Sequence, residues 1–160
     1  MTPPKAGPDL FTFSPHLGWQ YFKAIEEMIF FNQNQRKLLP LLREVIENYG
    51  TPHLAIVDRE VRLSMGKCEK AQCLFAFTNE PPADLAGVAV YVRDENVLKV
   101  LFTAIKAYEC YTGSHRPCLV LLMLEKLKDL AKAETGIESL EMFTGKRKLS
   151  FRLCNVGARP

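Results

Sequence analysis

Residues 73–78 read CLFAFT, residues 85–95 read LAGVAVYVRDE and residues 97–105 read VLKVLFTAI. After a loop, residues 119–136 read LVLLMLEKLKDLAKAETG and residues 137–144 read IESLEMFT. The first three segments are rich in β-branched and aromatic residues and are bounded by polar breaks, as strands are. The fourth has a helical period and ends at a glycine. This order predicts an α+β fold with a mostly antiparallel mixed sheet, two N-terminal helices and one long later helix.

The segment 119–135 has the clearest helical pattern in the chain, because its apolar residues form one stripe and its charged residues lie outside that stripe. We predict a helix from Leu119 to Thr135 that packs on the strands at 88–92 and 97–105. In the strand at 88–92, alternating valines predict that only one face is buried. The predicted core stripe of the helix consists of Val120, Met123, Leu124, Leu127, Leu130 and Ala131.

Residues 1–14 predict a loose N-terminal segment, within which Phe11 and Phe13 alternate with polar neighbours and predict a short edge strand. Ser14 followed by Pro15 is typical of a helix N-cap and first helical residue, so we predict a helix from Pro15 to Asn32. Large apolar residues surround most of this helix, which predicts contact with the second helix or with a second chain. They include Trp19, Phe22, Ile29, Phe30 and Phe31.

A second helix is predicted over residues 38–49, with Pro40 in its first turn and Gly50 at its end. Residues 54–57 and 61–65 predict two short strands joined by a turn at 58–60. A last hairpin is predicted about Thr144 to Lys146.

The composition is that of an ordinary single globular domain of 160 residues, with a formal charge of +3. No apolar run reaches the ~18 residues that a membrane helix needs, and the first residues do not form a signal-peptide core. Five cysteines without such a leader favour reduced thiols and a cytoplasmic location.

Residues 85–105, LAGVAVYVRDENVLKVLFTAI, resemble the central strands of the GNAT superfamily of acyl-CoA-dependent N-acyltransferases. The helix at 119–135, its glycine and the following strand that ends in threonine also resemble the family pattern. The resemblance covers about residues 73–144. It implies transfer of an acyl group from acetyl-CoA or another acyl-CoA to an amine.

The resemblance also implies where acyl-CoA would bind. The end of the strand at 97–105 would present backbone groups to the pantetheine arm, and the loop before the helix would hold the pyrophosphate near His115. The family's usual loop is an Arg/Gln-x-x-Gly-x-Gly/Ala run, whereas this loop offers one glycine followed by serine, and Pro117 removes one donor. The predicted cofactor residues are Thr103, Ala104, Ile105, Gly113, Ser114 and Arg116.

The same loop, residues 108–118, offers Glu109 and His115 as candidate bases for the amine. A solvent-exposed connection without chemistry is the competing interpretation of this loop. The missing phosphate motif and the apolar first helix support an alternative function, a non-catalytic interaction or regulatory protein, possibly dimeric.

Two further patterns in the chain do not predict a site. Cys68 and Cys73 could bind zinc together with the loop residues Cys110, His115 and Cys118, but the tight C-x-x-C spacing is missing, so no metal is predicted. The basic cluster at 146–152 lacks interleaved aromatic residues, so nucleic-acid binding is not predicted either.

Overall fold

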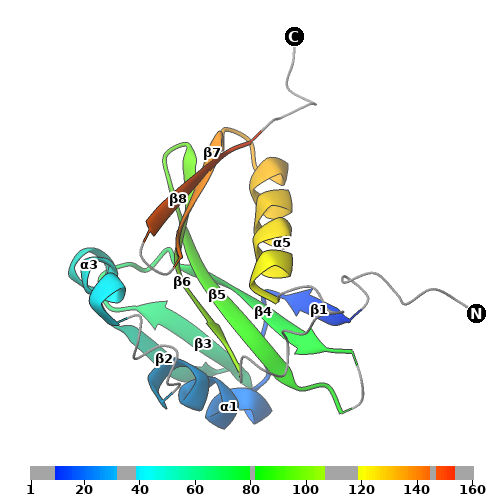
Figure 1. The fold of residues 1–160 in the computed structure, drawn as a ribbon. Helices are drawn as coiled ribbons and strands as arrows, with labels where there is room; N and C mark the ends of the chain where they lie inside the picture. The colour runs from blue at the N-terminus through cyan, green and yellow to red at the C-terminus, as the bar shows by residue number, and fades with distance from the viewer. Residues whose placement is uncertain (1–9, 32–38, 80–81, 107–118, 145–146, 154–160) are drawn as a thin grey trace, which may run out of the picture.

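The computed structural model describes residues 10–31, 39–79, 82–106, 119–144 and 147–153 (Figure 1). In chain order the elements are β1 (Phe11–Ser14), η2 (Trp19–Tyr21), α1 (Phe22–Glu26), η3 (Glu27–Phe31), α3 (Leu39–Tyr49), β2 (Pro52–Val57), β3 (Glu60–Met65), β4 (Gln72–Thr78), β5 (Leu85–Asp94), β6 (Val97–Ile105), α5 (Leu119–Ala133), β7 (Ser139–Thr144) and β8 (Arg147–Arg152).

Within the described residues the main sheet has six strands in the order β1-β4-β5-β6-β7-β8. Its neighbours are antiparallel except β6 and β7, which run parallel. The crossover from β6 to β7 includes α5, as a parallel connection requires. The predicted α+β class with a mostly antiparallel mixed sheet is therefore confirmed, and so are the edge strand β1 and the hairpin β7–β8.

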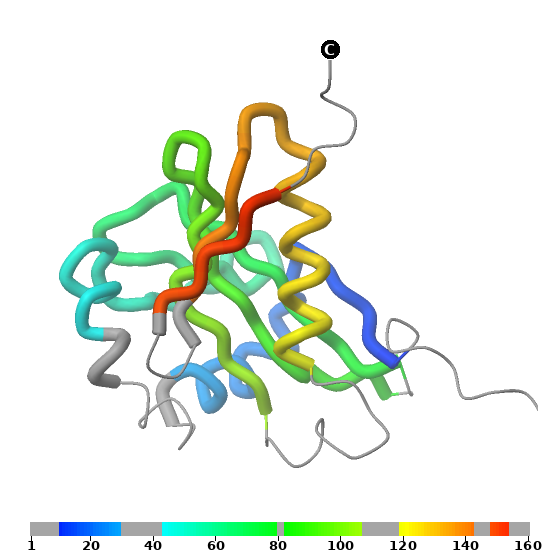
Figure 2. Tube along the Cα trace, turned by 45° about the horizontal axis from the view of Figure 1, so that its top comes forward, coloured from blue at the N-terminus to red at the C-terminus, as the bar shows by residue number. Residues whose placement is uncertain are grey.

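Helix α5 covers one face of the main sheet (Figure 2). Leu119, Met123 and Leu127 are completely buried there. They belong to one apolar cluster with residues of β4, β5, β6 and β7, among them Tyr91 and Leu140. The helix predicted over 119–135 is thus confirmed almost to its last residue.

The opposite face of the sheet is covered by α1, η3, α3 and the separate two-stranded sheet β2–β3. Ile25 and Ile29 from the helical segments, and Leu63 from β3, pack there against strand residues such as Val90. The main sheet is therefore the middle layer of the molecule.

Strand β5 differs from its predicted half-buried pattern. Every residue from Leu85 to Val92 is buried. The alternating valines face β2–β3 and the N-terminal helices, whereas Ala89 and Tyr91 face α5. The prediction was wrong because both faces of this central strand are covered by other elements.

The first helix also begins later than predicted. Strand β1 continues to Ser14, whose hydroxyl accepts a hydrogen bond from the His16 backbone N–H at 3.1 Å, and helical structure starts only at Trp19. The segment between them pairs instead with the β2–β3 hairpin, since Val61 N–H donates to the Leu17 carbonyl at 2.8 Å. This tertiary pairing outweighs the local capping signal, and the helical stretch is split into η2, α1 and η3.

The first helical stretch contacts its own chain as well as solvent. Ile25, Met28 and Ile29 are buried in the cluster beneath β5, and Phe22 packs against it. Trp19 is the exception, because 56% of its surface is exposed. The side chains of Phe30 and Phe31, and residue 32, lie outside the described part of the chain.

Helix α3 ends at Gly50 as predicted. Gly50 has a φ of +85°, and its N–H donates to the Ile46 carbonyl at 2.9 Å, as in a helix C-cap. The next contact ties the helix to the chain after β3, because Lys67 N–H donates to the Tyr49 carbonyl at 2.8 Å. The end of α3 is thereby fixed relative to the β2–β3 sheet.

Candidate functional site

Strands β6 and β7 form a fork. Their parallel ladder covers Val97 to Val100 on β6 and Ser139 to Met142 on β7. Beyond Val100, β6 continues to Ile105 beside β5, whereas the ladder to β7 has ended. We call this point of divergence the fork. It is the place where the sheet changes from continuous pairing to two separating strands.

A β-bulge lies at the fork. Val90 on β5 pairs with Phe102, and the next residue, Tyr91, pairs with Val100, so Leu101 is the extra residue. As a result, Leu101 and Phe102 both pack in the cluster beneath α1, η3 and α3, although neighbouring strand residues normally alternate between faces. The bulge therefore changes which side chains of β6 face the helical layer beyond the fork.

The closed end of the fork is held by hydrogen bonds around Asn96. Its carbonyl accepts from the N–H groups of Glu138 at 2.7 Å and Ser139 at 3.3 Å, and its side-chain amide donates to the Glu138 carboxylate at 2.8 Å. These contacts fix the start of β7 against the turn between β5 and β6.

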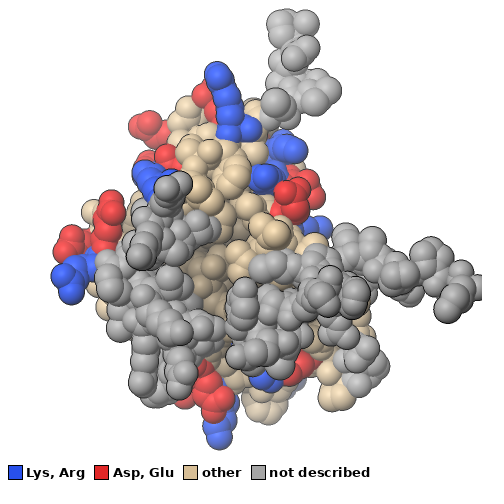
Figure 3. Space-filling view, in the orientation of Figure 1, with Lys and Arg blue, Asp and Glu red and all other residues tan. Residues whose placement is uncertain are grey.

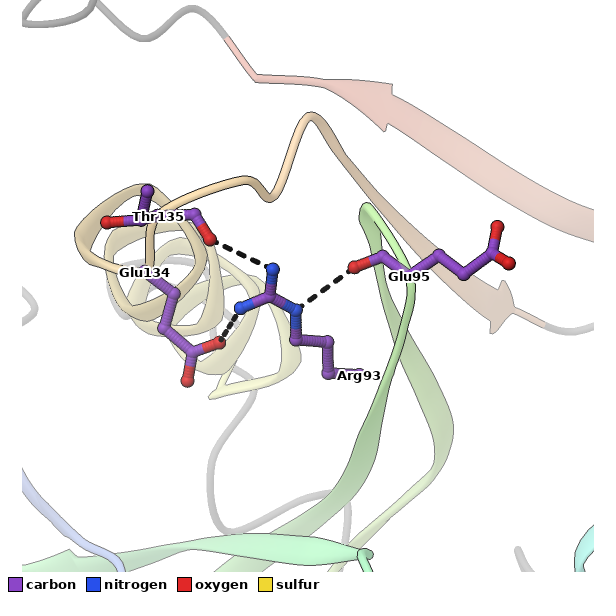
Figure 4. Close-up of polar contacts among 4 residues, drawn as sticks. All are labelled: Arg93, Glu95, Glu134 and Thr135. Carbon is purple, nitrogen blue, oxygen red and sulfur yellow. Dashed lines mark hydrogen bonds and ion pairs between the residues drawn. The ribbon is translucent and has the colours of Figure 1, made fainter.

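Arg93 adds a second clamp at this end (Figure 4). Its Nε donates to the Glu95 carbonyl at 3.0 Å, and its Nη2 donates to the Thr135 carbonyl at 2.9 Å. Its Nη1 lies 3.4 Å from the Glu134 carboxylate. One guanidinium thus joins the β5–β6 turn to the end of α5, where a positive charge also complements the helix dipole.

A polar pocket of about 60 Å³ opens beside the fork, between α3 and the strands β6, β7 and β8. Helix α3 contributes an acid, an amide and a phenol to it, and the strands contribute two lysines and one further acid. The lining residues are Glu44, Val45, Asn48, Tyr49, Lys99, Val100, Leu101, Glu141 and Lys148. The pocket is therefore lined by charges of both signs.

Glu141 is the central acid of this pocket. It lies opposite Lys99 in the β6–β7 ladder and pairs with Lys148 of β8 at 3.2 Å. Only 21% of its side chain is exposed. A carboxylate so placed can bind a cation in partial isolation from water.

Lys99 is held on the other side of the pocket. Its Nζ lies 2.8 Å from the Asp94 carboxylate. That hydrogen bond, reinforced by the nearby Tyr49 and Glu141, raises the pKa of Lys99 above its ordinary value despite some burial. Lys99 therefore stays charged throughout the neutral range.

The structure places only part of the predicted acyl-CoA site. Thr103, Ala104 and Ile105 lie on β6 beyond the fork, and Ala104 and Ile105 are buried. All the predicted loop residues lie outside the described residues: Glu109, Gly113, Ser114, His115 and Arg116. These assignments stay predictions.

Sequence reasoning missed the pocket itself. A signal was nevertheless present, because Lys99 interrupts the apolar run VLKVL and Glu141 interrupts SLEMF. Charged residues rarely occupy the middle of such strands unless they are paired. What the sequence did not show is that α3 supplies the opposite wall.

The described part of the chain contains no group of three His, Cys, Asp or Glu side chains able to hold a metal ion. Cys110, His115 and Cys118 lie outside it. Acidic and basic side chains are interspersed on the face shown in Figure 3, as the small formal charge suggests.

Cys73 is buried in β4 beneath the β2–β3 sheet, and its Sγ lies 3.9 Å from the Leu63 carbonyl. Burial raises the pKa of this thiol from 9.0 to about 12. Between these values the folded chain keeps a proton that the unfolded chain has lost, so the free energy of unfolding falls as the pH rises. At about pH 10 we expect a loss of roughly 1.4 kcal/mol relative to neutral pH.

Urea titrations across this pH range measure the effect, with Cys73→Ala as the test variant. Other groups also titrate in this range, so the quantity to compare is the slope of the free energy of unfolding against pH. We expect Cys73→Ala to remove part of that slope. Cys68→Ala is the matched control, because it removes a half-buried cysteine that lies between β3 and β4. Equal slopes in the wild type and Cys73→Ala would contradict the prediction.

No family model, curated protein or solved structure matches this chain. Among its described residues, no helix has the length and apolar character needed to span a membrane. The fork and its pocket are therefore the features of the described structure that bear on function.

Proposed function

We propose that this chain is a divergent GNAT-like N-acyltransferase that transfers an acyl group from acyl-CoA to an amine. The observation that carries the proposal is the fork, where a polar pocket opens beside the end of the β6–β7 ladder. A pantetheine arm is extended and contains amide groups, so it can lie along a strand much as an added peptide does. The part of β6 beyond Val100 is the place we assign to it.

The pocket would then hold the amine next to the thioester. An ammonium group gives one proton to the Glu141 carboxylate, and the free amine attacks the thioester carbonyl carbon. The new C–N bond forms as the C–S bond breaks, and the proton lost by the nitrogen goes to the leaving thiolate. The products are an amide and CoA, and Glu141 returns its proton to solvent.

A thiol-release assay with acetyl-CoA and a mixture of amines tests the proposal. Glu141→Gln keeps the shape of the side chain but removes the proton acceptor, so we expect kcat to fall by about 10²–10⁴-fold. Binding of acetyl-CoA, measured by calorimetry, should change little. Glu125→Gln is the matched control, because Glu125 is an exposed acid on α5, on the other face of the sheet.

The absence of both binding heat and thiol release at millimolar acetyl-CoA would reject the acyltransferase. A second candidate, a non-catalytic interaction protein that pairs with its own copy, would then be favoured. It is supported by the exposed apolar side chains of Trp19 and of Ile56 on β2, which line one surface hollow together with Arg59. Sedimentation would distinguish it, since Ile56→Lys dissociates such a dimer and leaves a monomer unchanged.

A further inference from the structure

The pocket at the fork combines both signs of charge in a small volume. Glu44 and Glu141 supply two carboxylates, and Lys99 and Lys148 supply two ammonium groups. A polyamine carries only positive charge and a phosphate only negative charge, so each would leave the pocket charges of its own sign unpaired. A lining with both signs matches a ligand that itself carries an ammonium and a carboxylate.

We propose that this pocket binds a free α-amino acid, and that the amino acid is the acyl acceptor. The acceptor role rests on the proposed acyltransferase function, whereas the binding of the amino acid does not. In the structure Glu141 and Lys148 pair with each other at 3.2 Å. An amino acid replaces this one ion pair with two, because its ammonium pairs with Glu141 and its carboxylate pairs with Lys148.

Other residues of the pocket give the ligand one orientation. Lys99 is held by Asp94 at 2.8 Å and adds positive charge on the β6 side. Glu44 forms no ion pair with any residue that the structure describes, and its charge repels the ligand carboxylate from the α3 side. The ammonium then lies beside Glu141, which is the acid next to the fork.

The volume restricts which part of the ligand enters. About 60 Å³ is several times the ~10–15 Å³ that one water needs, which is room for a few small polar groups but not for a large side chain. The pocket therefore accepts the ammonium and carboxylate of an amino acid and leaves a large side chain outside. A protein lysine, which has no neighbouring carboxylate, lacks one of the two expected ion pairs.

The binding test uses the full chain without acyl-CoA and three small probes of similar shape at equal ionic strength. L-Alanine carries both charges, ethylamine only the ammonium, and propionate only the carboxylate. In NMR titrations we expect L-alanine to bind at least about tenfold more tightly than ethylamine or propionate. A tenfold ratio of affinities corresponds to one ion pair with a partly buried group. Tighter binding of spermidine than of L-alanine would overturn the proposal.

Lys148→Met keeps the aliphatic stem and removes the charge, and we expect it to weaken L-alanine binding about tenfold or more. Lys126→Met is the control, because Lys126 is exposed on α5, on the other face of the sheet. Equal affinities of the two variants would also overturn the proposal.

The thiol-release assay separates the two ideas. Release with other amines, without L-alanine binding, rejects the amino-acid pocket but keeps the acyltransferase. L-Alanine binding without release rejects the acyltransferase but keeps the pocket.

Discussion

Replacing Leu127 with Ala is expected to lower the free energy of unfolding by about 2–5 kcal/mol, the range for a buried leucine. Leu127 lies in the middle of α5 and is 0% exposed. It packs in the cluster that joins the helix to β5, β6 and β7. Truncation removes its apolar contacts and leaves a cavity that the sheet on one side and the helix backbone on the other can fill only in part.

Urea denaturation monitored by circular dichroism measures this loss. Leu121→Ala is the matched control, because Leu121 lies on the same helix with 59% of its surface exposed. Both variants make the same change in helix propensity, but we expect the control to cost less than about 1 kcal/mol. Equal losses at the two positions would show that Leu127 is not a core residue.

Replacing Gly50 with Ala is expected to cost roughly 2–4 kcal/mol. The first part of this cost is conformational, since a φ of +85° is unfavourable for a residue with a Cβ by about 1–2 kcal/mol. The second part is steric, because the new Cβ would lie only 2.6 Å from the Lys67 backbone nitrogen. Backbone cannot rotate away as a side chain can, so the end of α3 must shift.

Gly136→Ala separates the two contributions. Gly136 has a similar φ of +91°, but its added Cβ would approach only the end of the Arg93 side chain, at 2.9 Å. We therefore expect denaturation to show a smaller loss for Gly136→Ala than for Gly50→Ala. A loss at Gly136 as large as that at Gly50 would contradict this prediction, because displacing the end of Arg93 would then cost as much as displacing the Lys67 backbone. L-Alanine binding should also weaken in Gly50→Ala, because α3 forms one wall of the pocket.

The sequence alone predicted those elements that their own pattern of residues is enough to identify. The stripe that includes Met123 and Leu127 identified α5, and Gly50 marked the end of α3. The prediction from sequence was wrong where packing against another layer of the fold decides which residues are buried. The alternation in β5 reads as half-buried, yet Ala89 and Tyr91 are covered by α5, an element about 30 residues further along the chain.

The candidate site was less predictable for a related reason. Lys99 and Glu141 are visible in the sequence as charged residues within apolar strands, but their alignment depends on the register of the β6–β7 ladder. The bulge at Leu101 left no glycine or proline to reveal it. The Ser14–Pro15 signal predicted a helix start because it was read locally, whereas pairing with the β2–β3 hairpin delays that start to Trp19.

The parallel pairing of β6 with β7 has a consequence for how the molecule assembles. Strands β4, β5 and β6 follow one another as simple antiparallel neighbours, so they can associate early at little entropic cost. The ladder between Val97 and Ser139 must instead close a long loop that contains α5. We expect β7 to join the sheet late in folding and to detach first in partial opening. Because the fork does not exist until β7 has joined, ligand binding is coupled to the last folding step, and a ligand at the fork should slow hydrogen exchange in β7 more than in β5.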